Sequence, residues 1–424
     1  MKSSAQHVVD LKKQYFIPCL YHFYQDPPVI VKGEMQYLYD DEGKRYVDFY
    51  SGVTVMNCGH CNPEIVEPAI DQIRTLQHTT SIYLTNPMVN LGEKLIKYLD
   101  CSLRKLFFVN SGSEANEGAI LLSRIHTGKR GVIAVNGGLH GRTALTMNAT
   151  GIDMWRTDPD EGHKVRFAPK PHCANCELGL SPETCGLACA GAVEKLLDKD
   201  SDVAAMIIEP IQGNGGIIVP PDGYFTRLKS ILEKHGVLLI FDEVQTGIGR
   251  TGMKYRFKAL GVEPDILTTA KALGNGFPIA AFCTTDKIAE SYRKPGASTT
   301  GGNAVSAAAA LAVLEYHEKY KLADRSAREG VYLKSRLEKL SEQFPFIAEV
   351  RGEGLMLGME LLDNGQPMPE AADRILENMM KHGFLIGKTG VSRNVVTFLP
   401  PLIIDRADID AMLTVLNESL ETCV

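Results

Sequence analysis

Short apolar runs alternate with helical patterns through the middle of this chain of 424 residues. Uniformly apolar runs occupy residues 132–135, 205–208 and 280–283, with helix-like stretches between them. A continuous apolar run indicates a strand buried on both faces, and strands that alternate with helices indicate a parallel sheet covered by helices. The chain also exceeds the size at which one core usually stops growing, so we expect two packed units.

The ends of the chain show a different pattern, which predicts a second, smaller domain. Two β-rich runs flank an Asp-Asp-Glu-Gly turn within residues 36–47, as is typical of a hairpin. Residues 346–351 and 354–360 have the composition of further strands. We therefore predict an α/β fold in which a small α+β domain is built from both chain ends. Its parts are 1–60 and 306–424, and the large domain is 61–305.

Lys271 follows a short apolar run and precedes two glycines, Gly274 and Gly276. The glycines let the backbone turn tightly, so the amine is expected to project from the carboxyl edge of the sheet. Ligands of α/β proteins bind at that edge. Taken by itself, a lysine at this position would more often be a solvated loop residue, because lysine is rarely buried without a partner.

Asp242 ends the apolar run 237–241. A carboxylate at the end of a buried strand is costly without a cationic or hydrogen-bonding partner. The protonated ring nitrogen of pyridoxal phosphate (PLP) is such a partner, and a lysine on a later strand can hold the same cofactor. Taken alone, Asp242 could also be a helix cap or a turn residue.

A third segment joins a strand-like run, 105–109, to the sequence Ser111-Gly112-Ser113 and a helical pattern. Ser111 and Glu114 have the spacing of a capping box. Free N–H groups at such a helix start bind phosphate. An ordinary capped helix is an equally good interpretation of this segment alone.

Together these motifs resemble the class III, or ω-, aminotransferases of the fold-type I PLP enzymes. The resemblance implies a PLP-dependent aminotransferase whose large domain, 61–305, binds the cofactor. It extends over nearly the whole chain and rests on residues 46–52, 59–60, 110–116, 140–142, 209–213, 242–247, 271, 299–303 and 351–354.

The resemblance also implies a role for each matched residue around the cofactor. Lys271 would form the Schiff base and transfer the catalytic proton, and Asp242 would hold the ring nitrogen. Gln245 would contact the ring hydroxyl. The other cofactor contacts that it implies are Gly112, Ser113, Leu139, His140, Glu209 and Thr299. Thr299 would reach the cofactor of a neighbouring subunit, so we expect a homodimer or a dimer of dimers with active sites at the interface.

The substrate-binding residues implied by the same resemblance are Arg142, Val53, Tyr83, Thr397 and Asn214. Ornithine- and 4-aminobutyrate-using relatives have an arginine in place of Thr397 and a glutamate in place of Asn214. Loss of the arginine alone would leave the buried glutamate carboxylate unpaired, which is costly. Here both charged residues are absent, so no unpaired charge remains. Val53 stands where ornithine-using relatives have a tyrosine, so ornithine is not expected as a substrate.

Arg142 is retained, and a bidentate guanidinium suits a carboxylate or sulfonate held away from the reacting carbon. We therefore expect an ω-amino acid as donor, of the β-alanine, 4-aminobutyrate or taurine type. The acceptor would be a 2-oxo acid, such as 2-oxoglutarate, pyruvate or glyoxylate, in a ping-pong cycle. A PLP-dependent racemase, epimerase or amine lyase is the alternative on this fold. An alternative from another class is a zinc-stabilised binding protein in which Lys271 is inert.

Four of the ten cysteines form the pattern C-x2-C-x8-C-x3-C within an insert at about 171–190. They are Cys173, Cys176, Cys185 and Cys189. Four thiolates can close a tetrahedral zinc site, so a structural zinc is one prediction for this insert. The alternative is a metal-free loop, since free cysteines also pack as small apolar side chains.

Charge and targeting signals limit the classes of partner. The formal net charge is −6, so neither nucleic acid nor an anionic membrane is expected to bind. The N-terminal residues show no apolar core of a signal peptide, and no run approaches about 18 uncharged apolar residues. We therefore expect a soluble, cytoplasmic protein. The G-x-G-x-x-G sequence at 247–252 opens no amphipathic helix, so we interpret it as a loop, not a dinucleotide site.

Overall fold

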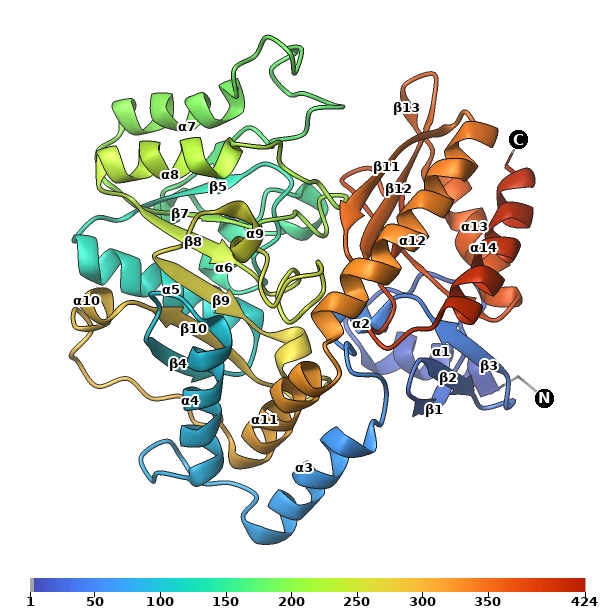
Figure 1. Ribbon diagram of the computed structural model, residues 1–424, viewed down its shortest axis with the longest axis horizontal. Coiled ribbons are helices and arrows are strands. Elements are labelled where there is room, and N and C mark those ends of the chain that lie inside the picture. The colour runs from blue at the N-terminus through green and yellow to red at the C-terminus, as the bar shows by residue number, and fades with distance from the viewer. Residues whose placement is uncertain (1–3, 424) are drawn as a thin grey trace.

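The computed structural model describes residues 4–423 and shows a larger and a smaller part (Figure 1). The larger part is built on a seven-stranded sheet of order β4-β10-β9-β8-β7-β5-β6. The strands from β9 to β6 are parallel, whereas β10 runs antiparallel to β4 and β9. This confirms the predicted mainly parallel sheet. In sheet order the strands are Lys105–Val109, Ala280–Thr284, Ile266–Thr269, Leu238–Asp242, Val203–Ile208, Gly131–Val135 and Val165–Ala168.

The central strands β5 and β7 are buried along their whole length because helices cover both faces of the sheet. Alternate residues point to opposite faces. Ile207 and Ile240 belong to the apolar cluster of helix α5 (Gly112–Thr127), while Ile208 and Phe241 belong to the cluster of helix α8 (Tyr224–His235). A strand buried on both faces needs apolar residues at every position, which explains the uniform runs in the sequence.

The strands that run in one direction end at the same edge of the sheet, and their following residues carry the polar side chains. Asp242 is the last residue of β8, Glu209 follows β7, and Lys271 lies two residues beyond the end of β9. Strand β4 ends just before Ser111 and helix α5. One edge of the sheet therefore collects the residues that the sequence marked as functional.

The smaller part joins both ends of the chain. The predicted hairpin forms from β2 (Tyr37–Asp40) and β3 (Arg45–Asp48), and β3 pairs in parallel with β14 (Phe384–Leu385). Strand β1 (Ile30–Glu34) completes that sheet. A second sheet has the order β11-β12-β16-β15, with strands Ile347–Glu353, Met356–Asp363, Val395–Phe398 and Gly387–Thr389, and β13 (Gln366–Pro367) pairs with β12. The predicted boundaries at 60 and 305 stay predictions.

Helices pack around the three sheets and connect the two parts (Figure 1). In the smaller part they are α1 (Ser4–Tyr15), α12 (Leu322–Gln343), α13 (Pro369–Lys381) and α14 (Arg406–Glu421). The remaining α-helices are α2 (Ser51–Thr54), α3 (Pro63–Thr75), α4 (Asn86–Leu99), α6 (Ala144–Asn148), α7 (Ala188–Lys199), α9 (Phe257–Leu260), α10 (Asp286–Ala289) and α11 (Ala304–Lys319). Among residues 4–423, no helix combines the length and the apolar character needed to cross a bilayer.

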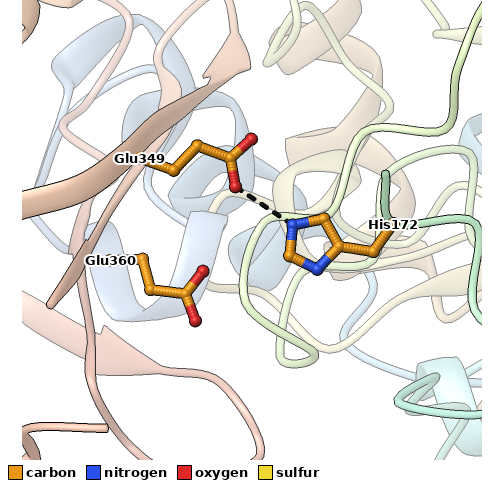
Figure 2. Close-up of side chains that lie close together, drawn as sticks. All are labelled: His172, Glu349 and Glu360. Atoms are coloured by element: carbon orange, nitrogen blue, oxygen red, sulfur yellow. Dashed lines mark hydrogen bonds and ion pairs between the residues drawn. The ribbon is translucent and has the colours of Figure 1, made fainter. Parts of the chain in front are cut away.

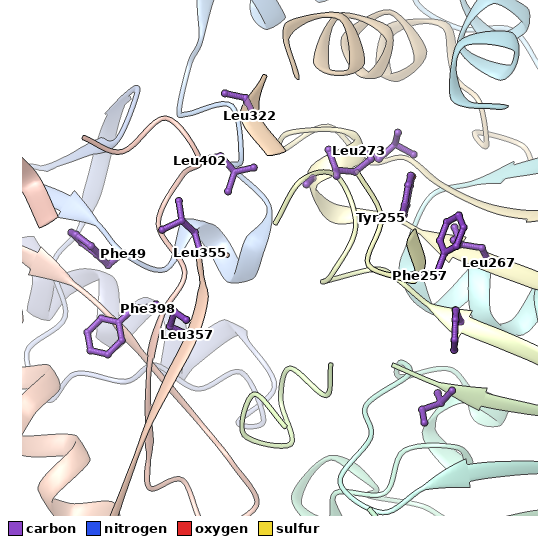
Figure 3. Packing of buried hydrophobic residues seen from close by; sticks show 14 of the residues in the cluster. Phe49, Tyr255, Phe257, Leu267, Leu273, Leu322, Leu355, Leu357, Phe398 and Leu402 are labelled. Carbon is purple, nitrogen blue, oxygen red and sulfur yellow. The ribbon is translucent and has the colours of Figure 1, made fainter. Parts of the chain in front are cut away.

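One apolar cluster extends from the large sheet into the smaller part (Figure 3). Leu267 and Tyr255 lie on the side of the large sheet, while Leu357 and Phe398 come from the second small sheet. Because these side chains share one continuous core, we expect movement of one part against the other to expose apolar surface, which is unfavourable.

Candidate active site

The loops at the carboxyl edge of the large sheet enclose a cavity of about 360 Å³. That volume is within the usual range for small-molecule sites. Larger hollows occur elsewhere, such as one of about 630 Å³ beside α13, but they do not lie at this edge. The sequence-predicted residues that line the cavity are Lys271, Asp242, Gln245, Gly112, Ser113, Leu139, His140, Glu209 and Arg142.

Lys271 is the only lysine among the described residues that line the cavity. Its amine makes no hydrogen bond or ion pair with any residue in the range 4–423. Its backbone adopts a φ of 47°, an unusual conformation for a residue with a side chain, in the turn after β9. Burial lowers the pKa of Lys271 to about 8, against the opposing effect of the Glu209 and Asp242 charges. A large fraction of the amine is therefore neutral, and so nucleophilic, near pH 8.

Asp242 forms the floor of the cavity and is only 3% exposed. Its Oδ2 accepts a hydrogen bond from Asn116 Nδ2 at 2.8 Å and lies 2.8 Å from His140 Nδ1. Its Oδ1 accepts from the backbone N–H of Val244 at 3.1 Å. These contacts hold the carboxylate in place, as a buried charge requires.

Glu209 is a second buried carboxyl group in the cavity lining. Its two oxygens accept the backbone N–H groups of Leu139 and Gly213, both at 2.9 Å. Burial, with the neighbouring Asp242 charge, raises the pKa of Glu209 to about 7. Glu209 therefore fixes the loop that carries Leu139 and can carry a proton near neutral pH.

The start of helix α5 forms one wall of the cavity, with little room for side chains. A Cβ added to Gly112 would lie 3.1 Å from Val244 Cγ1, and one added to Gly141 would lie 2.4 Å from Ser113 Oγ. The Ser113 hydroxyl accepts the backbone N–H of Arg142 at 3.1 Å. A ligand can thus approach the backbone at the positive end of a helix, which suits a phosphate.

Asn116 was missing from the predicted site residues, although it lines the cavity. It is 1% exposed, donates to Asp242 and to the backbone oxygen of His140, and accepts from the Thr268 hydroxyl at 2.7 Å. The sequence held a signal for it, because Asn116 lies one helical turn after Gly112 and so shares its face.

Several predicted substrate residues, and the predicted cofactor contact Thr299, do not line the cavity. Tyr83 is 68% exposed and Thr299 is also exposed. Val53 is partly buried, with a φ of 64° that is strained for a β-branched residue. Thr397 is buried in β16, where its backbone pairs with Gly387, and its Oγ1 has no hydrogen-bond partner among the described residues.

Asn214 lies near the same small sheet. Its backbone oxygen accepts the N–H of Gly390 at 3.0 Å and the Thr389 hydroxyl at 2.7 Å, and Thr389 belongs to β15, the strand that pairs with β16. Thr397 and Asn214 therefore mark the junction between the loop after β7 and the smaller part. Neither supplies a charge to the cavity.

The residues of the cavity fit PLP. Asp242 offers a fixed carboxylate, the start of α5 offers a phosphate cradle, and Lys271 offers an unpaired amine. His140 is the partner of the Asp242 carboxylate in this lining, with its Nδ1 2.8 Å from Asp242 Oδ2. A fixed buried carboxylate, an unpaired amine and a phosphate-binding helix start are the three contacts that this cofactor needs.

Comparison with known proteins agrees with this geometry. The sequence model of the family described as Aminotransferase class-III matches residues 23–420. Alanine–glyoxylate aminotransferase 2 homolog 2, mitochondrial, from Arabidopsis thaliana is 40% identical over 98% of this chain and 88% of that protein. A leucine/methionine racemase from Thermococcus litoralis is 36% identical over 93% of this chain and 90% of that protein.

Comparison with solved structures indicates the same family as comparison of the sequences. A solved (S)-enantioselective omega-transaminase from Thermomicrobium roseum is similar with a TM-score of 0.92, at 29% identity and over 100% of both chains. The predicted fold-type I architecture is therefore confirmed. Because the family match and a relative at 40% identity each cover nearly the whole chain, this protein belongs to the class III aminotransferases, the PLP-dependent transaminases.

Proposed function

We propose that this enzyme transfers the amino group of an ω-amino acid to a 2-oxo acid by a ping-pong cycle. The observation that carries the proposal is Arg142. It is the only arginine among the described residues that line the cavity, and its guanidinium forms no ion pair with any of them. An unpaired guanidinium beside Lys271 suits a substrate whose acid group is separated from its amine.

The residues of the cavity divide the work of the reaction. When bound, PLP supplies an electron sink that allows bonds at the amine-bearing carbon to break. The Asp242 carboxylate sets the negative charge at the cavity floor, and the start of α5 binds the phosphate. The Nζ atom of Lys271 accepts a proton from the amine-bearing carbon and later returns one, a role that its lowered pKa supports.

Donor and acceptor would use the same cavity in turn, and Arg142 would bind the acid group of the donor. Thr397 and Asn214 lie outside the cavity lining, so no second charged clamp selects an α-carboxylate there. This supports β-alanine, 4-aminobutyrate or taurine as donor type. Leu139 in the lining would cover the cofactor ring with an apolar surface.

The proposal includes a homodimer or a dimer of dimers. Tyr83 and Thr299 are exposed and outside the lining of their own cavity, so their predicted ligand contacts need a second chain. The segment just before α4 also exposes Ile82 and Leu84, at 76% and 81%. Such neighbouring apolar side chains are typical of an interface. The cytoplasmic location stays a prediction.

A donor screen with the Arg142→Ala variant tests the substrate class. We expect KM for ω-amino acids to rise about tenfold to a hundredfold, because a hydrogen bond to a charged group contributes about 1.5–3 kcal/mol. Simple amines without an acid group should keep their KM and serve as the internal control. Arg142→Lys should recover only part of the loss, since lysine cannot bind an acid through two parallel hydrogen bonds. Equal effects on both classes of amine would assign Arg142 a structural role.

The racemase relative makes racemisation the second candidate function. The two activities differ in their need for an acceptor. Transamination stops after one half-reaction without a 2-oxo acid, whereas racemisation continues. Sustained loss of optical activity from a single amino acid, without a 2-oxo acid, would therefore favour the racemase.

A further inference from the structure

The insert between β6 and α7 has no regular secondary structure over residues 169–187. Irregular segments of this length are uncommon in compact domains unless they are functional or disordered. Residues 177–184 are exposed throughout, including Leu178 and Leu180 at 39% and 44%. Apolar burial therefore contributes little to ordering this insert, so its conformation needs another source of stability.

The four cysteines of the insert converge on one small cavity of about 70 Å³. This is more than twice the volume that a water molecule occupies in the liquid, about 30 Å³. Three of the thiols are partly buried and Cys173 is exposed. A sequence pattern spread over 17 positions, from 173 to 189, is thus gathered around one space.

The surroundings of this cavity would favour thiolates. Cys189 lies in the first turn of α7, where the helix dipole favours negative charge. The lysine Lys170 lines the same cavity. Both positive features would offset the excess negative charge of four thiolates around one divalent cation.

A second cluster lies beside the insert and is the less suitable metal site. Among residues 4–423, only one group of three or more His, Cys, Asp or Glu residues has potential metal-ligating atoms that all lie within 4.8 Å of one another. It consists of His172, Glu349 and Glu360 (Figure 2). Arg351, however, donates to both carboxylates, and its Nη1 lies 2.6 Å from Glu349. The guanidinium already supplies the positive charge that a metal would bring. This cluster instead joins the insert to β11 and β12.

We propose that Cys173, Cys176, Cys185 and Cys189 bind one structural zinc ion. The sulfur atoms do not yet form a closely spaced group, so binding requires side-chain rotations that bring each to about 2.3 Å from the ion. The insert also contacts the active-site loop, because Glu177 accepts from Asn136 Nδ2 at 2.9 Å. Asn136 directly precedes the 137–142 loop that carries Leu139 and His140, so zinc binding would help to hold that loop.

The test is metal analysis of the PLP-loaded enzyme, purified without chelator or metal-affinity tag. We expect about one zinc per chain in the wild type and in Cys19→Ser, which changes an exposed cysteine outside the cavity. Cys176→Ser and Cys189→Ser should each lose most of the metal. A chelator should lower the melting temperature of the wild type, with recovery on adding zinc chloride, and should leave that of the variants unchanged.

A mercurial titration covers the case in which the variants fail to fold. In the wild type, zinc released to a metallochromic dye should rise in step with modification of the thiols and reach one ion per chain. A protein that contains no zinc, takes up none from zinc chloride and shows no chelator effect overturns the proposal. Disulfide bonds among these four cysteines would overturn it as well.

Discussion

The floor and the rim of the active-site cavity are built differently. At the floor, Asp242 and Glu209 are buried, and each carboxyl group is held by partners from the same chain. At the rim, Arg142 is exposed, and its guanidinium has no ionic partner among residues 4–423, while Thr299 is exposed outside the cavity lining. A buried charge needs hydrogen-bonding or ionic partners within the fold, whereas an exposed charge is solvated by water until a ligand binds. One chain therefore completes the floor, whereas Arg142 at the rim is left for the substrate, and we propose that Thr299 serves a second subunit.

The largest effect should come from Lys271→Ala. Turnover should fall by several orders of magnitude, because both covalent attachment and proton transfer at the substrate carbon depend on this amine. The measurement is turnover with a saturating donor and acceptor. Lys105→Ala is the control, since that exposed lysine lies at the start of β4 and far along the strand from the cavity. Turnover of Lys271→Ala near that of the wild type would contradict the assignment of the floor.

The pH dependence of Lys271 is a second test of the floor. With a pKa of about 8, half of the amine is neutral near pH 8, and the neutral fraction falls as the pH decreases. An ordinary lysine would be neutral at roughly one part in 300 there, so covalent capture should be about 150-fold faster at pH 8. Borohydride trapping of PLP added to apoprotein, followed by peptide mass analysis, measures this rate. A capture rate that keeps rising steeply above pH 9 would show that burial does not lower this pKa.

Asp242→Asn keeps the shape of the floor but removes its negative charge. We expect turnover to fall roughly a hundredfold, which corresponds to about 2.7 kcal/mol in the barrier. The readout is kcat at saturating PLP, together with the visible absorption spectrum of the bound cofactor. Asp265→Asn serves as the control, because Asp265 accepts from Lys229 just before β9, away from the cavity lining. A loss of less than tenfold would mean that another group keeps the ring nitrogen protonated.

The sequence predicted the floor better than the rim, and the reason is physical. Uniform apolar strands leave little freedom for the polar residue that follows each one, so Asp242 and Lys271, which the strand pattern indicated, lie at one edge. Glu209 lies there too, although only the family resemblance predicted it. Asn116 escaped because it lies inside a helix, where a polar residue is usually solvent-facing. Asn116 lies one turn after Gly112 on the same face of the helix. The sequence does not show that this face is the buried one, and the packed structure does.

The rim was predicted from the family resemblance alone. Thr397 and Asn214 lie at the junction with the small sheet instead of in the cavity lining, and Tyr83 is exposed outside the lining. Loop positions such as these depend on contacts between distant segments and between chains, for which local sequence patterns carry little information.

The smallest effect should come from Thr299→Ala at the rim. If its hydroxyl binds a phosphate across the interface, the Kd for PLP should rise about tenfold, since one hydrogen bond to a charged group contributes about 1.5 kcal/mol. Thr300→Ala is the matched control, because the Thr300 hydroxyl donates to Asn110 of its own chain at 2.8 Å. PLP affinity is measured by fluorescence titration of the apoprotein.

Mixed dimers show which chain Thr299 serves. One subunit carries Lys271→Ala and the other carries Thr299→Ala, so only the second can bind PLP covalently. A cross-subunit contact would give that site an intact Thr299 from the first subunit, and the active half of the sites should then have wild-type affinity. Tenfold weaker binding in the mixed dimer would show that Thr299 acts within its own chain. In that case one chain would build the rim as well as the floor, and the difference between the two regions would be one of exposure only.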